Sequence, residues 1–258
     1  MKPFDADRFR AASRESKPKL GRPLMYQPVT GSTNDNALLA ARSGAPHGSL
    51  FVTDEQTAGR GRRGNTWLSA AGESLLFSVL LRPELELAQA SALTLAVGLA
   101  LRDAIGPLLS DVAKLKWPND LYVNDKKLAG ILVESQLQGE RLQAVVVGVG
   151  LNVSSRGFPA EIAARATSLA LLGAADIERE PLLQAVLNAM ALRVDAYQRT
   201  GVAGILDELN AADALRDRRL RVDAQEGVGR GIDEQGRLLL ADDAGVVHAI
   251  IAGTVELL

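Results

Sequence analysis

Between residues 114 and 153, short segments predicted as strands alternate with tight polar turns, and this pattern limits the possible folds more than any other feature. The segments are 114–117, 121–123, 127–134 and 142–153. The turn Asn-Asp-Lys at 124–126 is typical of a β-hairpin. Strands that follow one another through turns this short pair antiparallel. We therefore predict a largely antiparallel sheet at the centre of the fold.

Apolar side chains at helical spacing predict helices that cover this sheet. The longest such segment spans residues 84–109, where Leu93, Val97 and Leu101 fall on one face. Shorter helices are expected over 34–42, 181–198 and 205–215, and further strands over 26–29, 49–53 and 75–81. With helices packed on one side of a mixed, largely antiparallel sheet, the predicted fold class is α+β.

The composition changes at residues 216–219, where four charged residues follow one another. Short strands are then expected over 220–222, 227–232, 238–241 and 246–251, separated by turns rich in Asp and Gly. So few short strands are marginally stable alone and need a larger domain to dock on. We predict a main domain over residues 1–214 and a small β-barrel over residues 215–258.

Composition excludes several classes of function. The absence of cysteine rules out disulfides, thiolate nucleophiles and cysteine metal sites, and the two histidines, His47 and His248, are far apart in the sequence. The 29 Lys and Arg residues nearly balance the 31 Asp and Glu residues, which argues against binding to a phosphate backbone. The first residues lack the apolar core of a signal peptide, and the apolar segment 91–109 contains Arg102 and Asp103. We expect a cytoplasmic protein that does not span a membrane.

Residues 59–64, Gly-Arg-Gly-Arg-Arg-Gly, contain three glycines and three arginines. Glycine lets the backbone come close to a ligand, and arginine offers a planar set of donors that suits phosphate and carboxylate. We predict a mobile loop that becomes ordered around an anion. Two plainer interpretations are a solvated basic turn and an RNA-binding arginine-glycine patch.

Four motifs give the chain a close resemblance to a known family. They are GSTN at 31–34, QTAGRGRRG at 56–64, KWPNDLYVNDKKLAGIL at 116–132 and GVGLNV at 148–153. With these motifs the chain resembles the biotin protein ligases from about residue 26 to its last residue. The resemblance implies a catalytic domain related to lipoate ligases, followed by an SH3-like barrel. It also implies that ATP and biotin, with Mg²⁺, form biotinyl-5′-AMP, and that a lysine of a biotin carboxyl carrier protein then receives the biotin.

The first of these steps brings a carboxylate against an α-phosphate, so fixed cations are needed at the reaction centre. The resemblance places Lys127 between the two reactants and Arg62 at the phosphoryl region. Lys126 is expected to face water, because adjacent strand residues point to opposite sides. Asp120 keeps two candidate roles: accepting a proton from the incoming lysine, or orienting Mg²⁺ and the Lys127 ammonium.

The resemblance also assigns binding residues, while the metal ligands stay unknown. For biotin these are Ser32, Thr33, Asn34, Gln56, Gly59, Arg60, Arg62, Lys127 and Gly130. For ATP or the adenylate these are Arg62, Arg63, Trp67, Lys116, Asn119, Lys127, Gly150, Asn152 and Arg230. Trp117 is expected either as a wall of the biotin slot or as a core residue.

The sequence departs from one branch of the family. Members that also act as transcriptional repressors carry an N-terminal winged helix-turn-helix domain, whereas only 25 residues precede Tyr26 here. We therefore expect ligase activity without DNA binding. An exposed sheet edge could also pair two chains into a homodimer, and the sequence does not decide this.

Two other functions compete with the ligase. Lipoate or octanoyl transfer uses the same scaffold, but the arginine-rich loop and the lack of a cysteine nucleophile count against it. A nucleic-acid-binding module would use residues 59–64, but five Phe, three Tyr and two Trp leave it few stacking platforms.

Overall fold

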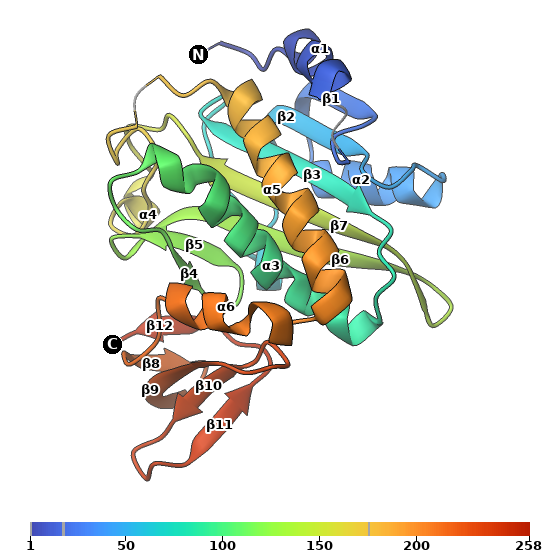
Figure 1. The fold of residues 1–258 in the computed structure, drawn as a ribbon. Helices are drawn as coiled ribbons and strands as arrows, with labels where there is room; N and C mark the ends of the chain where they lie inside the picture. The colour runs from blue at the N-terminus through green and yellow to red at the C-terminus, as the bar shows by residue number, and fades with distance from the viewer. Residues whose placement is uncertain (1, 17–18, 175) are drawn as a thin grey trace.

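The computed structural model describes residues 2–16, 19–174 and 176–258, which form two β-sheets with helices around the larger one (Figure 1). The larger sheet has the strand order β1-β2-β3-β7-β6-β5-β4. Its strands are β1 (Leu24–Thr30), β2 (Leu50–Gln56), β3 (Ser74–Leu81), β4 (Lys114–Lys116), β5 (Asp120–Val123), β6 (Lys126–Gln138) and β7 (Arg141–Asn152). Among the described strands only β1 and β2 pair in parallel. The predicted mixed, largely antiparallel sheet is confirmed.

Helices pack on both faces of this sheet, whereas we predicted them on one. The helices are α1 (Ala6–Ser16), α2 (Thr33–Arg42), α3 (Leu87–Ile105), α4 (Ala160–Ala163), α5 (Arg179–Thr200) and α6 (Leu206–Ala212). α3 and α5 lie side by side on one face (Figure 1). Successive side chains of a strand point to opposite faces of the sheet, so both faces carry apolar residues that a helix can cover. Leu50 and Val79 belong to the main core, while their neighbours Phe51 and Leu80 pack with α2.

Helix α3 is the buried helix that the sequence predicts. Residues Gln89–Leu108 are long and apolar enough to cross a membrane, and no other helix in the described part of the chain is. Here, however, α3 packs on the sheet and against α5, and Leu93, Val97 and Leu101 are fully buried there. Its apolar character therefore serves the core of the fold.

The C-terminal strands form a second, antiparallel sheet in the order β11-β10-β9-β8-β12. Its strands are β8 (Arg219–Val222), β9 (Gln225–Ile232), β10 (Leu238–Ala241), β11 (Val247–Ile250) and β12 (Val255–Leu257). β11 and β12 are its edges, and no pairing joins them among the described residues. The predicted barrel is therefore corrected to an open sheet. β11 has only four residues and is largely exposed, so it offers little apolar surface for closure.

Asp213 lies where the chain passes from the larger sheet to the smaller one. The N–H of its neighbour Ala214 donates to the carbonyl of Leu115 at 2.8 Å, so this segment still pairs with β4. The predicted boundary between residues 214 and 215 stays a prediction. Asp213 is buried, and its carboxylate accepts a hydrogen bond from the N–H of Leu215 at 2.8 Å. Burial raises the pKa of Asp213 to about 6.

We expect Asp213 to make the fold less stable as the pH rises. Its pKa is raised from 3.8 to about 6 by folding, so its contribution is fully present below pH 3.8 and is lost as the pH rises through about 6. In Asp213→Asn, which cannot ionise, the free energy of unfolding should depend less on pH over this range, by up to about 3 kcal/mol. Urea unfolding of both proteins across this range measures the difference. Parallel stability curves would contradict the prediction.

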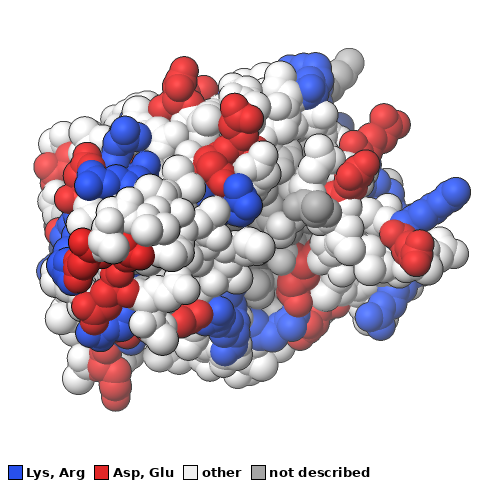
Figure 2. Space-filling view, turned by 90° about the horizontal axis from the view of Figure 1, so that it is seen from below, with Lys and Arg blue, Asp and Glu red and all other residues white. Residues whose placement is uncertain are grey.

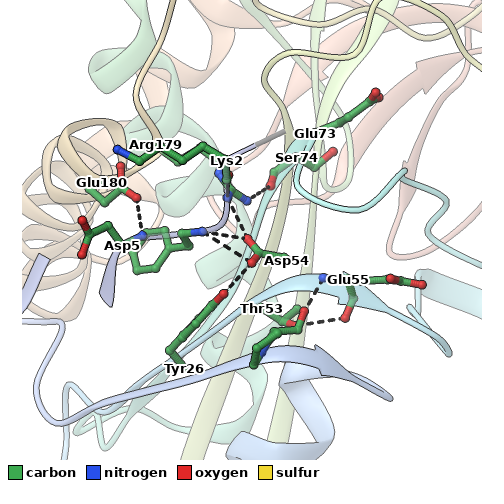
Figure 3. Close-up of polar contacts among 12 residues, drawn as sticks. Lys2, Asp5, Tyr26, Thr53, Asp54, Glu55, Glu73, Ser74, Arg179 and Glu180 are labelled. Atoms are coloured by element: carbon green, nitrogen blue, oxygen red, sulfur yellow. Dashed lines mark hydrogen bonds and ion pairs between the residues drawn. The ribbon is translucent and has the colours of Figure 1, made fainter. Parts of the chain in front are cut away.

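A buried ion pair fixes the N-terminal segment to the sheet (Figure 3). Arg179, at the start of α5, lies 2.7 Å from the Asp54 carboxylate of β2, with side chains 8% and 12% exposed. Asp54 also accepts the N–H of Phe4 at 3.2 Å and the hydroxyl of Tyr26 at 2.5 Å. Burial and this bond raise the pKa of Tyr26 to about 12. The network holds β1, β2, α5 and the N-terminal segment together near the point where the chain leaves β2.

Candidate active site

A cavity of about 830 Å³ lies over the β5-β6-β7 part of the larger sheet. Its walls come from residues 60–68 after β2, residues 158–166 after β7, and residues 253–257 of the smaller sheet. Ligand pockets usually measure about 300–1,000 Å³. The cavity therefore has room for a small ligand, and it joins segments that are far apart in the sequence.

A charged pair lies on the floor of the cavity. Lys127 Nζ is 2.7 Å from Asp120 Oδ1, and the two side chains are 32% and 18% exposed. The hairpin of β5 and β6 brings them together, and an irregularity in register at Leu121 and Tyr122 places Lys127 opposite Tyr122. The Asp120 carboxylate thus forms an ion pair with an ammonium group that lines the cavity, although Asp120 Oδ1 makes no hydrogen bond to a described residue.

A second lysine, Lys116 of β4, reaches the same floor. Its Nζ lies 4.9 Å from the centroid of the Tyr122 ring and 3.4 Å from the Tyr122 hydroxyl. Burial lowers the pKa of the Lys116 ammonium, and the nearby Asp120 opposes this effect. Burial also raises the pKa of Tyr122 to about 12, so the phenol stays neutral at pH 7. Two lysines beside one carboxylate make this floor suitable for an anion.

Trp67 covers two glycines of the sheet. Gly130 of β6 and Gly150 of β7 pair with each other, and an added Cβ would lie 2.9 Å or 2.4 Å from the Trp67 ring. Glycine at both positions therefore lets the indole approach the sheet. The ring centroid is 5.5 Å from Lys127 Nζ. Trp67 Nε1 is buried and has no hydrogen-bond partner among the described residues, so this donor is available to a ligand.

The predicted glycine-arginine loop is a short hairpin in the structure. The N–H of Gly61 donates to the carbonyl of Asn65 at 2.7 Å, and the N–H of Trp67 donates to the carbonyl of Gly59 at 3.0 Å. A 3₁₀ turn, Arg62–Gly64, forms its tip. We call residues 59–67 the arginine hairpin.

The three arginines of this hairpin have different surroundings. Arg60 binds the carboxylates of Asp35 and Glu134 at 2.6 and 2.9 Å. Arg63 binds a carboxylate of the smaller sheet. Arg62 lines the cavity and has no hydrogen bond or ion pair to another described side chain, and burial lowers the pKa of its guanidinium. Arg62 is therefore the arginine of the hairpin that is available to an anion in the cavity.

Ser32, Thr33 and Gln56 form a polar wall of the cavity. The N–H and the hydroxyl of Thr33 both donate to Gln56 Oε1, at 2.8 and 3.1 Å. The Ser32 side chain is buried, and its hydroxyl has no partner among the described residues. The Ser32 hydroxyl and the Gln56 amide nitrogen are therefore free to bind a polar ligand group.

Asn34 lines the same wall, but the protein itself uses its amide. Asn34 Nδ2 donates to the Glu134 carboxylate at 2.7 Å, and Asn34 Oδ1 accepts the hydroxyl of Ser78 at 2.6 Å. A Cβ at position 148 would lie 2.1 Å from Asn34 Oδ1, so Gly148 makes room for this side chain. Of the assigned polar residues on this wall, Asn34 has the least capacity left for a ligand.

Most of the assigned residues meet at the cavity. Those that line it are Ser32, Thr33, Asn34, Gln56, Arg60, Arg62, Arg63, Trp67, Lys116, Asn119, Asp120, Lys127, Gly130, Gly150 and Asn152. Gly59 and Arg230 are not among the lining residues. Arg230 is exposed on β9, where its guanidinium lies 2.9 Å from the Asp217 carboxylate. The structure therefore gives no support to a nucleotide contact from Arg230.

Several assigned side chains are bound within the protein. Asn119 donates to the carbonyl of Ile131 at 2.7 Å, and the buried Asn152 donates to the carbonyl of Thr167 at 2.9 Å. Trp117 also lines the cavity, but it is 3% exposed and its indole N–H donates to the carbonyl of Gly236 at 3.0 Å. The structure thus places Trp117 mainly in the core.

Residues 158–166 line the cavity but were not predicted to belong to the site, and their Arg165 adds a further cation to the cavity wall. The backbone of β6 holds this segment: the N–H of Lys127 donates to the carbonyl of Arg165 at 2.8 Å, and Thr167 donates back to Lys127 at 2.9 Å. Two isolated backbone hydrogen bonds produce no recognisable pattern of residues in the sequence. Only the closeness of this segment to the GVGLNV motif at 148–153 could have pointed to it.

The described residues contain no group of three or more His, Cys, Asp or Glu side chains placed to hold a metal ion. Asp120 is the acidic residue at the floor, and it is paired with Lys127. A Mg²⁺ ion at this cavity would therefore arrive with its ligand, because Mg²⁺ binds phosphates and water with few protein carboxylates.

Two parts of the chain each match a known protein family. Residues 26–152 match the biotin/lipoate A/B protein ligase family, and residues 222–258 match the biotin protein ligase C-terminal domain. The bifunctional ligase/repressor of Bacillus spizizenii is 35% identical over 244 residues, which covers 92% of this chain and 75% of that protein.

Two further relatives have the same general size. The biotin–[acetyl-CoA-carboxylase] ligase of Mycobacterium tuberculosis is 37% identical over 236 residues, with 88% of this chain and 85% of that protein covered. A structure of the biotin protein ligase of Aquifex aeolicus, solved with biotin and ATP, superposes with a TM-score of 0.78 at 29% identity. That superposition covers 92% of this chain and 99% of the Aquifex aeolicus chain.

Proposed function

The chain belongs to the biotin protein ligase family, and we propose that it activates biotin with ATP and transfers it to a lysine of a carrier protein. The Aquifex aeolicus structure with biotin and ATP supports the two small substrates. The name of the Mycobacterium tuberculosis relative supports a carrier of acetyl-CoA carboxylase as the acceptor. The observation that carries the proposal is that Lys127 and the unpaired Arg62 line one cavity of suitable size.

In the first step, a carboxylate oxygen of biotin attacks the α-phosphorus of ATP, and pyrophosphate leaves. Both reactants are anionic, and negative charge grows on the α-phosphate in the transition state. Lys127 is held at the floor by Asp120 and can contact both reactants, while Arg62 approaches from the hairpin. Cations fixed in this way stabilise the developing charge without having to reorganise.

In the second step, the amine of the acceptor lysine attacks the acyl carbon of biotinyl-5′-AMP, and AMP leaves. The 2.7 Å contact with Lys127 supports the orienting role of Asp120. The Asp120 oxygen that lies 2.7 Å from Lys127 Nζ is already paired, so it is less accessible to the acceptor amine. We therefore assign Asp120 to orienting Lys127, with Mg²⁺ entering as MgATP.

Pyrophosphate exchange tests the first step of this proposal. The purified chain should incorporate labelled pyrophosphate into ATP only when biotin is present. Lipoate in place of biotin is the matched control, because the matched family contains both kinds of ligase. Exchange with lipoate and not with biotin would overturn the choice of substrate.

We also propose that this chain does not bind DNA specifically, although some relatives are named ligase/repressors. Lys and Arg are interspersed with Asp and Glu on the face seen from below (Figure 2), and the net charge is −2. A protein with no net positive charge gains little from counterion release. We expect no shifted band at physiological salt, with or without biotin and ATP. A band that survives competitor DNA would contradict this.

Because ATP is the co-substrate, we propose that the reaction takes place in the cytoplasm. Self-association through an edge of the larger sheet stays a prediction. Its edges are β1 and β4, and β4 already bonds to the segment at Ala214, so a pair of chains would use β1.

A further inference from the structure

The smaller sheet is fixed to the larger one by buried contacts beside the cavity. The indole N–H of Trp117 donates to the carbonyl of Gly236 at 3.0 Å, and Ala214 donates to Leu115 at 2.8 Å. Arg218, just before β8, also pairs with Asp125 of the β5–β6 turn. The smaller sheet can therefore serve as a rigid support for a movable part of the site.

The arginine hairpin contacts this support at one bidentate ion pair. Arg63 donates from its two terminal nitrogens to the two oxygens of Asp223, at 2.7 and 3.2 Å, and to the hydroxyl of Thr254 at 3.3 Å. Asp223 lies in the β8–β9 turn, and its carboxylate also accepts the N–H of Thr254 at 2.9 Å. The acceptor is therefore oriented by the smaller sheet before Arg63 reaches it.

The backbone of Arg63 fits this interpretation. Arg63 has φ 53° and ψ 36°, a left-handed conformation that non-glycine residues seldom adopt. Such a conformation persists where surrounding contacts hold it. The bidentate pair is the strongest side-chain contact of Arg63. Arg62, the neighbouring residue, has no such partner and lines the cavity.

We propose that Asp223, oriented by Thr254, is a positioning residue that latches the arginine hairpin over the cavity and so keeps Arg62 at the phosphoryl group. This inference rests on the proposed ligase function. Exposed ion pairs are weak and are screened by salt. Arg63 and Asp223 are about half exposed, so the latch can open to admit substrates and release product.

The chain contains a matched control for this pair. Arg219 and Asp243 form a second bidentate pair on the smaller sheet, at 2.8 and 3.2 Å, and neither residue lines the cavity. Asp223→Ala should release bound biotinyl-5′-AMP about two- to fivefold faster than the parent protein, the range expected for one exposed ion pair. Asp243→Ala should not change this rate, and both variants should keep the thermal stability of the parent.

Two further measurements separate the latch from a general role in folding. Trypsin cleavage after Arg60, whose partners Asp35 and Glu134 stay in place, should be faster in Asp223→Ala and unchanged in Asp243→Ala. Adding Arg63→Ala to Asp223→Ala should have little further effect on adenylate release, because both changes break the same ion pair and only the 3.3 Å contact of Arg63 with Thr254 is lost in addition. Equal release rates and equal cleavage in the Asp223 and Asp243 variants would overturn the latch. If the parent protein forms no adenylate, the ligase proposal fails, and the cleavage comparison still tests the latch.

Discussion

Lys127→Ala should lose biotin-dependent adenylate formation by about 10²–10³-fold or more, while the protein stays folded. The ammonium of Lys127 is fixed by Asp120 at 2.7 Å and lines the cavity where the two anionic reactants meet. Lys116, the second lysine at the floor, does not occupy the same place, because its ammonium contacts the Tyr122 hydroxyl. The initial rate of pyrophosphate release with saturating biotin and MgATP measures the loss.

Lys126→Ala is the internal control for this prediction. Lys126 precedes Lys127 on β6, is exposed, and does not line the cavity. Its removal should change the rate by less than about twofold, as expected for a surface lysine. Thermal unfolding of both variants shows whether Asp120, left without its partner in Lys127→Ala, destabilises the fold. A folded Lys127→Ala protein that releases pyrophosphate at the rate of the parent would exclude the assigned role.

Arg62→Ala should shorten the lifetime of bound biotinyl-5′-AMP more than it slows the formation of that adenylate. Arg62 is the arginine of the hairpin without a protein partner, whereas Arg60 and Arg63 are paired with carboxylates. The hairpin therefore stays formed in the variant but loses its contact with the ligand. One charge-assisted hydrogen bond contributes about 1.5–3 kcal/mol, which corresponds to a roughly 10- to 150-fold shorter lifetime.

Stopped-flow measurement of both rates decides how Arg62 works. Adenylation is followed by pyrophosphate release, and adenylate loss by the appearance of free biotin in the absence of acceptor. The outcome that would reject a role in retention is a normal adenylate lifetime together with a crippled first step. That result would mean that Arg62 acts only through its charge on the transition state.

The strands of the larger sheet follow from local patterns in the sequence. Residues 114–153 form hairpins as their turns predict, and the segment 84–109 contains α3 because its apolar residues repeat at helical spacing. The helix expected over 205–215 ends at Ala212 instead, since Asp213 leaves helical geometry to pair near β4. Boundaries of this kind depend on contacts with distant residues.

Features that depend on distant partners could not be predicted. Closure of the smaller sheet would require β11 to meet β12, and nothing local in Val247–Ile250 decides this. The three arginines of the hairpin look alike in the sequence. They differ in their partners, which come from three separate segments of the chain. Arg60 pairs with Asp35 and Glu134, Arg63 pairs with Asp223, and Arg62 pairs with none of these carboxylates. The resemblance brought most assigned residues to the cavity, but it could not show which side chains the protein itself uses.

The most direct test of the ligase function is the intact mass of an acceptor carrier domain after incubation with this chain, biotin and MgATP. We predict the addition of one biotinyl group, lost when ATP is omitted and lost when the acceptor lysine is replaced by arginine. The Lys127→Ala protein should leave the mass unchanged under the same conditions. A carrier mass that stays unchanged with the folded parent chain, or that rises equally without ATP, would contradict the proposed ligase function.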